Sequence, residues 1–171
     1  MMIKNSFLFG VLVIVVALVV KSISKPKLKH FNAVEFGAWW PFMSNDLLVK
    51  LDALREKWGA PIEVSTAGGS LGREGGDSHS QHNVARWGEV RAVDVFAKVR
   101  TGNGYKYVTT ETERADLLRV ASSVGFTGIG IYTDTSPGNL LHVDVRKDRK
   151  TNDPALWSRV DGEYQAISVV V

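Results

Sequence analysis

The sequence predicts an α+β domain in which a small antiparallel sheet is flanked by helices, with one apolar helix ahead of it. Residues 44–58 and 110–124 repeat apolar side chains at helical spacing, and a glycine follows each segment. Between and after these helices lie short segments rich in β-branched residues. The expected strands are 61–66, 90–96, 128–132 and 140–146.

The apolar helix expected at the N-terminus covers residues 6–20, which carry no charge and lie between Lys4 and Lys21. This stretch is shorter than the ~20 residues of a full membrane span. It fits either a short signal anchor with snorkelling lysines or a signal-peptide core cleaved after Ser24. We favour the anchor, so residues 1–29 are expected to form a membrane anchor and a basic linker.

The charge of the chain is divided unevenly between this arm and the body. Five lysines and no acidic residue precede Glu35, and the remainder holds 16 basic and 18 acidic residues. A slightly acidic body argues against nucleic acid as a partner, and the basic arm is expected to lie near anionic lipid headgroups. Because cysteine is absent, disulfides, thiolate metal sites and cysteine nucleophiles are excluded.

The first helix of the body can be capped by Ser44 or Asn45 and is ended by Gly59. The second begins with a capping box, in which Thr110 and Glu113 satisfy each other's backbone amides.

Residues 67–78 are polar and rich in glycine, which is typical of a loop. We expect one domain over residues 30–148, followed by a tail, 149–171, in which 166–171 could form a closing strand.

Three side chains in the body could hold a catalytic metal ion. His82 ends the glycine-rich region, while Asp94 and His142 lie on two of the expected strands. Two imidazoles and one carboxylate provide the three protein ligands of a catalytic zinc ion and leave a fourth position for water. Asp144 lies two residues after His142 and shares its face of the strand. It could be the general base, or it could orient a metal ligand.

These residues occur in motifs that resemble the LAS-type zinc peptidases, in particular the branch of D-alanyl-D-alanine carboxypeptidases and phage endolysins. The motifs are Ser80-Gln81-His82, Arg91-Ala92-Val93-Asp94-Val95 and His142-Val143-Asp144-Val145-Arg146. The resemblance extends from about residue 31 to 146. It implies a D-Ala-D-Ala carboxypeptidase-like or hedgehog-like fold, Zn²⁺ bound by His82, Asp94 and His142, and cleavage of peptidoglycan stem peptides.

The chain departs from the pattern of this family at three places. Residues 83–89 contain an apparent insertion. The arginine that can hold a substrate carboxylate is not in its usual position, and Arg73 is the nearest candidate. Asn139 occupies a position that is often acidic, so the general-base assignment moves to Asp144. Ser80 and Tyr132 join Arg73 as expected substrate-binding residues.

Two other functions stay open at the level of the sequence. A binding module could keep the fold and the metal without catalysis, as Asn139 suggests, and Ser80 could be the nucleophile of a serine hydrolase.

A peptidase domain acting on peptidoglycan would face the cell wall or lie in the membrane of a virus particle. Four lysines after the apolar segment favour the opposite, cytoplasmic orientation. The sequence does not decide between them.

Overall fold

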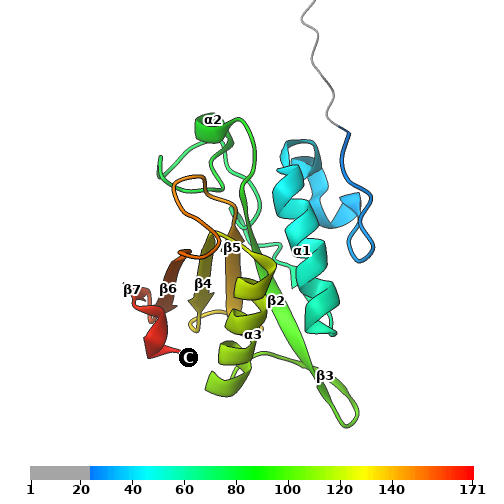
Figure 1. The fold of residues 1–171 in the computed structure, drawn as a ribbon, viewed down its shortest axis with the longest axis vertical. Helices are drawn as coiled ribbons and strands as arrows, with labels where there is room; N and C mark the ends of the chain where they lie inside the picture. The colour runs from blue at the N-terminus through cyan, green and yellow to red at the C-terminus, as the bar shows by residue number, and fades with distance from the viewer. Residues whose placement is uncertain (1–23) are drawn as a thin grey trace, which may run out of the picture.

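The computed structural model describes residues 24–171 as an α+β domain, which confirms the predicted class. Two long helices cover one face of a seven-stranded sheet (Figure 1). The elements in chain order are η1 (Ala33–Phe42), α1 (Asn45–Trp58), β1 (Ile62–Val64), α2 (Val84–Trp87), β2 (Ala92–Thr101), β3 (Gly104–Tyr107), α3 (Glu111–Val124), β4 (Gly128–Tyr132), β5 (Leu140–Asp144), β6 (Ala155–Val160), β7 (Glu163–Gln165) and η2 (Ile167–Val169).

The sheet has the strand order β1-β2-β5-β4-β6-β7, and β3 forms a hairpin with β2. Neighbouring strands are antiparallel except for β4 and β6, which run parallel. The expectation of a wholly antiparallel sheet is therefore wrong at this pair. The cause is the connection after β5, which crosses to the other side of β4 instead of folding back as a hairpin.

The two faces of the sheet differ in chemistry because side chains alternate along each strand. One face packs against α1 and α3 and forms the core. Its fully buried strand residues include Val93, Val95, Ile129, Ile131, Leu141 and Val143. The residues between them, including Asp94 and His142, must point to the other face. The expected metal ligands Asp94 and His142 thus lie on the face of the sheet away from the long helices.

Both predicted long helices are confirmed with the glycines that end them, but Ser44, the N-cap of α1, makes no capping hydrogen bond with its side chain. Gly59 and Gly125 end α1 and α3 in the left-handed conformation, with φ of 71° and 91°. Glycine reaches this region without the steric cost that other residues meet. The predicted capping box of Thr110 and Glu113 is present at the start of α3.

Residues 149–171 form β6, β7 and η2. The closing strand expected at 166–171 is wrong, because η2 occupies this stretch. The strand that closes the sheet ends at Gln165, and η2 follows it. Asp161 and Gly162 both have positive φ, 50° and 86°, as a two-residue hairpin turn requires. This turn sets β7 against β6 three residues earlier than the apolar pattern suggested.

The segment before η1 is attached to α1, along which it runs in Figure 1. The Asp52 carboxylate accepts hydrogen bonds from the backbone amides of Lys29 and His30, at 3.0 and 2.7 Å. Arg55 donates to the carbonyl oxygen of His30. The predicted membrane segment lies outside the described residues, and within residues 24–171 no helix has the length and apolarity needed to span a bilayer.

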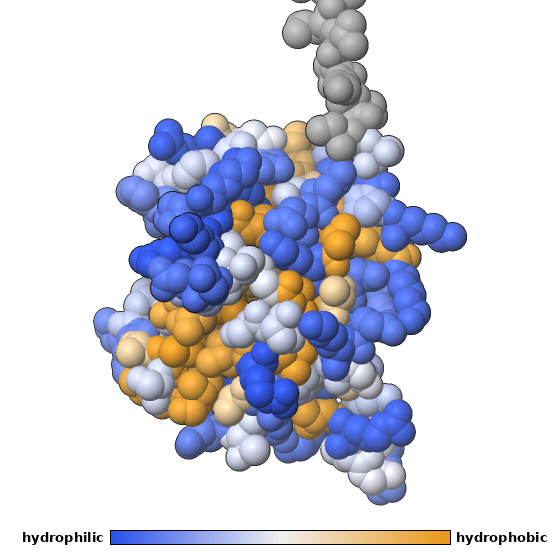
Figure 2. All heavy atoms as spheres, viewed as in Figure 1, coloured by the Kyte–Doolittle hydropathy of each residue, from blue (hydrophilic) through white to orange (hydrophobic). Residues whose placement is uncertain are grey.

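The view of the helix-covered face in Figure 2 shows apolar side chains gathered toward the C-terminal end of the chain. Val169 of η2 is 57% exposed and Leu156 of β6 is 41% exposed. This patch is separate from the polar face of the sheet that carries Asp94 and His142.

Candidate metal centre

Strand pairing places two of the three expected ligands opposite each other. In the antiparallel pair of β2 and β5, Asp94 is the direct partner of His142. Directly opposed side chains are about 5 Å apart at Cβ, so the two polar ends can meet. Register alone therefore brings together residues that are 48 positions apart in the chain.

The third residue, His82, is brought in by the loop between β1 and α2. Arg73 donates its backbone amide to the carbonyl oxygen of His82, and Val84 donates its own to that of Arg73. The Ser80 hydroxyl accepts a hydrogen bond from the backbone amide of His82 at 3.3 Å. These bonds hold an otherwise irregular segment over the sheet, where His82 is 3% exposed.

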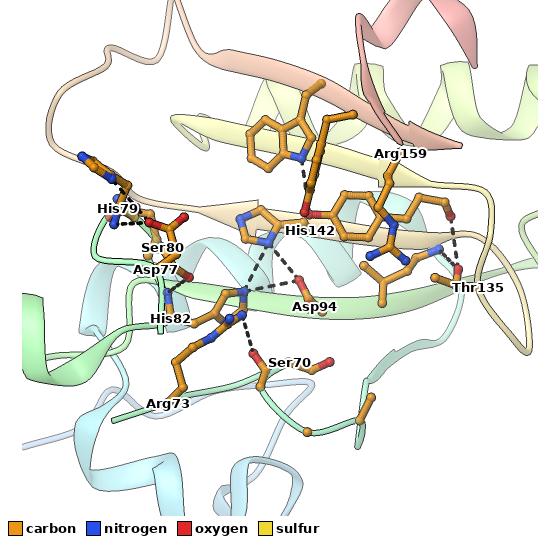
Figure 3. A pocket seen from close by; sticks show the side chains of 18 of the residues that line it. Ser70, Arg73, Asp77, His79, Ser80, His82, Asp94, Thr135, His142 and Arg159 are labelled. Carbon is orange, nitrogen blue, oxygen red and sulfur yellow. Dashed lines mark hydrogen bonds and ion pairs between the residues drawn. The ribbon is translucent and has the colours of Figure 1, made fainter. Parts of the chain in front are cut away.

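The three predicted ligands converge, with Nε2 of His82, Oδ1 of Asp94 and Nδ1 of His142 close together (Figure 3). His82 Nε2 lies 3.3 Å from His142 Nδ1 and 3.5 Å from Asp94 Oδ1, and the last two atoms are 2.8 Å apart. Ligands about 2.1 Å from a tetrahedral metal ion are about 3.4 Å from one another. The group could hold a metal ion, and only the 2.8 Å pair would have to open.

The remaining nitrogen of each imidazole has an acceptor that fixes the tautomer. His82 donates its Nδ1 hydrogen to the carbonyl oxygen of Leu71. His142 donates its Nε2 hydrogen to Asp144 Oδ2, at 3.2 Å. Because a carbonyl or carboxylate oxygen can only accept, each ring can direct a lone pair from its other nitrogen to the common centre.

The contacts within this centre shift the pKa values of His142 and Asp94 in opposite directions. Burial by itself lowers the pKa of His142, but hydrogen bonds to Asp144 and Asp94 outweigh it and raise the pKa to about 9. Burial alone would raise the pKa of Asp94, yet the bonds from His142 and His82 hold it well below its usual value. Both shifts favour an imidazolium form of His142, whose Nδ1–H donates to the Asp94 carboxylate.

Asp144 has the contacts of an orienting residue. It has no exposed surface and lies on the Nε2 side of the His142 ring, away from the three converging atoms. Its carboxylate also accepts both Nε and Nη2 of Arg146. Burial would raise its pKa, but the bonds from His142 and Arg146 lower it to about 2. These contacts favour the orienting role left open by the sequence, and the general-base role stays a prediction.

Two glycines of β4 make room for this arrangement. A Cβ at Gly128 would lie 2.3 Å from the Asp144 carboxylate, and one at Gly130 would lie 2.5 Å from the indole of Trp157. Trp157 of β6 thus lies across β4 and reaches His142, with 5.1 Å between the ring centres. A glycine at alternate positions of a strand is the sequence signal for such a close approach.

Replacing Gly130 with alanine is expected to displace Trp157 and to lower the free energy of unfolding by about 1–3 kcal/mol. The shift should also weaken metal binding, because Trp157 contacts a ligand. Gly102 is the matched control, since a Cβ there meets nothing within 4 Å. Chemical denaturation and metal titration of both variants measure the effect. Equal losses in Gly130→Ala and Gly102→Ala would contradict the packing role of Trp157.

A pocket of about 710 Å³ opens beside the centre and contains all three expected substrate residues, Arg73, Ser80 and Tyr132. Within residues 24–171, the buried Nε of Arg73 has no hydrogen-bond partner. The Tyr132 hydroxyl accepts a hydrogen bond from Trp157 Nε1 at 3.3 Å. Ser80 bonds the backbone of His82 and not its ring, so its contacts do not form the serine–histidine pair of a hydrolase.

Asn139, at the often acidic position of the resembled family, turns away from the pocket. Its side chain accepts a hydrogen bond from Arg114 of α3 at 3.0 Å and donates to the carbonyl oxygen of Thr133. It is 8% exposed and faces the helix side.

The tail contributes pocket residues that the sequence analysis missed, namely Trp157, Arg159 and Tyr164. Trp157 and Arg159 alternate with Leu156, Ser158 and Val160, and this period of two could have indicated a strand with one polar face.

No protein-family model matches the chain, and neither the curated proteins nor the solved structures give a match. The arrangement of side chains around His82, Asp94 and His142, together with the motifs that carry them, is thus the basis for a functional proposal.

Proposed function

We propose that this protein is a zinc-dependent peptidase that cleaves the stem peptides of bacterial peptidoglycan, tethered to a membrane through its N-terminal segment. The domain would face the cell wall or lie on the membrane of a virus particle. The observation that carries the proposal is the convergence of Nε2 of His82, Oδ1 of Asp94 and Nδ1 of His142 beside an open pocket. Two imidazoles and one carboxylate are the donor set of catalytic zinc, with a position left for water.

When bound, zinc would supply a Lewis acid that polarises an amide carbonyl and lowers the pKa of a water molecule towards ~7. The chain itself would orient the ligands, through the Leu71 carbonyl and the Asp144 carboxylate. Arg73 would bind a carboxylate of the substrate, because it lines the pocket and its guanidinium, within the described residues, donates only to the Gly69 carbonyl oxygen. Tyr132 would donate its hydroxyl hydrogen to the bound peptide, because its oxygen already accepts from Trp157.

A non-catalytic module that binds peptidoglycan is the second candidate, and a specific observation favours it. Asn139 cannot take a proton and turns toward Arg114, while Asp144 is engaged with His142 and Arg146. Among the described residues that line the pocket, the carboxylates are Asp77 and Asp94. Asp77 is two-thirds exposed on the rim and is the remaining pocket carboxylate that could accept a proton.

Turnover of purified peptidoglycan by the full-length protein separates these two candidates. A peptidase is expected to release new amino groups from the polymer, to lose this activity with a chelator, and to regain it with added Zn²⁺. Sedimentation with the polymer but no release of amines at any zinc concentration would overturn the peptidase and leave the binding module. Release of amines that a chelator does not affect would overturn the role of the metal.

Zinc affinity is expected to rise with pH, because the metal ion must displace the proton on Nδ1 of His142. The pKa of this group is raised to about 9, above the ~6.5 of a free histidine. Between pH 6.5 and 9 the affinity should increase by up to about tenfold per pH unit, and it should level off above pH 9. Competition with a fluorescent chelator across this range measures the slope. A flat profile would show that His142 is not protonated in the metal-free protein.

A further inference from the structure

The hairpin of β6 and β7 places another guanidinium, that of Arg159, in the pocket. Arg159 of β6 is paired with Tyr132 of β4, which in turn is paired with Leu140 of β5. His142 lies in the neighbouring row of the same face, two residues along β5. One such step is about 7 Å along a strand. In Figure 3, Arg159 and Arg73 lie on opposite sides of the cluster of His82, Asp94 and His142.

The guanidinium of Arg159 is bound along its Nε–Nη2 edge by Asp134, and one of its faces lies on the ring of Tyr132. The edge that contains Nη1 stays open to a ligand. Asp134 accepts from Nε and Nη2 at 3.0 to 3.1 Å. The ring of Tyr132 lies under the group, 4.6 Å from its central carbon. Within residues 24–171, Nη1 of Arg159 makes no hydrogen bond, and the side chain is 30% exposed and lines the pocket.

Asp134 is itself fixed, so the orientation of Arg159 does not depend on a ligand. Its carboxylate accepts the backbone amide of Gly162 at 2.7 Å, which ties the turn between β6 and β7 to the end of β4. Tyr164 of β7 lies edge-on to Tyr132, with ring centres 6.1 Å apart, and is 67% exposed at the rim. A guanidinium positioned in advance loses little side-chain entropy when it binds.

The free edge of Arg159 is the part of the pocket that suits an anion at this place. The pocket as a whole carries no excess of positive charge, because Arg146 and Arg159 are paired with Asp144 and Asp134, and Asp77 and Asp94 also line it. A divalent metal ion would add positive charge to it. A planar guanidinium edge matches the geometry of a carboxylate and can bind it through paired hydrogen bonds.

We propose that Arg159 forms a second carboxylate subsite, which binds a substrate residue one or two positions from the cleaved bond, on the side opposite to Arg73. The proposal rests on the proposed function, because it names the part of a stem peptide that the pocket recognises. Stem peptides carry carboxylates both at the C-terminus and on the α-carbon of their γ-linked D-glutamate. Residues 149–171, which contain Arg159, would thus determine which substrate carboxylate the pocket recognises.

Three synthetic peptides test this subsite on the full-length protein after metal removal, so that binding is measured without turnover. They are L-Ala-γ-D-Glu-L-Lys-D-Ala-D-Ala, the same peptide with the D-glutamate α-carboxylate as an amide, and the same peptide with an amidated C-terminus. We expect both amidations to weaken binding to the wild type, one of them through Arg159 and at least fivefold in calorimetry. In Arg159→Ala the effect of that one amidation should disappear, and Arg159→Lys should retain part of it. Arg119→Ala is the matched control, because Arg119 is an exposed arginine of α3.

Full effects of both amidations in folded Arg159→Ala would overturn the subsite, as would the absence of any carboxylate preference in the wild type. The zinc-loaded wild type is tested in parallel for cleavage of the same peptides and of peptidoglycan. Cleavage without a contribution from Arg159 would leave the peptidase and remove the subsite. A preference that depends on Arg159, with no cleavage at any zinc concentration, would leave the subsite and remove the peptidase.

Discussion

Replacing His142 with alanine is expected to reduce bound zinc from about one equivalent to near zero and to abolish peptidoglycan cleavage. The substitution removes one of three protein donors, Nδ1, from the centre of the cluster. The loss of affinity should exceed the roughly 10–100-fold that is typical when only a residue behind a ligand is changed. Elemental analysis of the purified protein, before and after dialysis against Zn²⁺, measures the metal content.

His79 is the matched control for this experiment. It belongs to the same loop as His82, but its side chain is 94% exposed and contacts Asp77 at the rim. We expect His79→Ala to keep its zinc and its thermal unfolding midpoint. Equal zinc content in His142→Ala and the wild type would exclude the cluster as the metal site.

Replacing Asp144 with alanine is expected to have the second largest effect, because it removes the partner of buried His142 and of half-buried Arg146. The Arg146 guanidinium would lose its carboxylate, at a cost of up to the ~3–5 kcal/mol that is typical of a fully buried pair. His142 would lose the acceptor that orients its ring, with an expected 10–100-fold loss of zinc affinity. Denaturant titration and zinc competition measure the two effects separately.

Asp144→Asn distinguishes the orienting role from the general-base role. An amide oxygen can still accept the Nε2 hydrogen of His142, but it cannot take up a proton. If Asp144 orients the ring, excess zinc should restore most of the turnover of Asp144→Asn. If Asp144 is the base, turnover should fall by about 10²–10⁴-fold at saturating zinc while the zinc affinity stays close to that of the wild type.

Much of the fold could be predicted because its signals are local. The apolar spacing of residues 44–58 and 110–124 identified both long helices, and the glycines after them are their end residues. The meeting of Asp94 and His142 could also be anticipated, since both lie on strands. Their direct opposition depends on the register of β2 and β5, which no local signal contains.

The part of the site that could not be predicted depends on long-range packing. Trp157 reaches His142 only because β6 lies parallel to β4 and because Gly130 leaves the space between them empty. No local sequence pattern predicts that the chain crosses from β5 to β6 on the other side of β4. None predicts that Trp157 fills the space over Gly130. The direction of the Asn139 side chain likewise depends on Arg114, which lies 25 positions away.

The attachment of the segment before η1 to α1 sets a limit on how the protein can be shortened. A shortened version that begins at residue 30 would remove Lys29, whose backbone amide and side chain bind Asp52 and Glu56. Asp52 would lose a partner at the middle of the first long helix. A version that begins at Ser24 keeps these bonds, so it is the shortened form in which the metal content can be compared with that of the full-length protein.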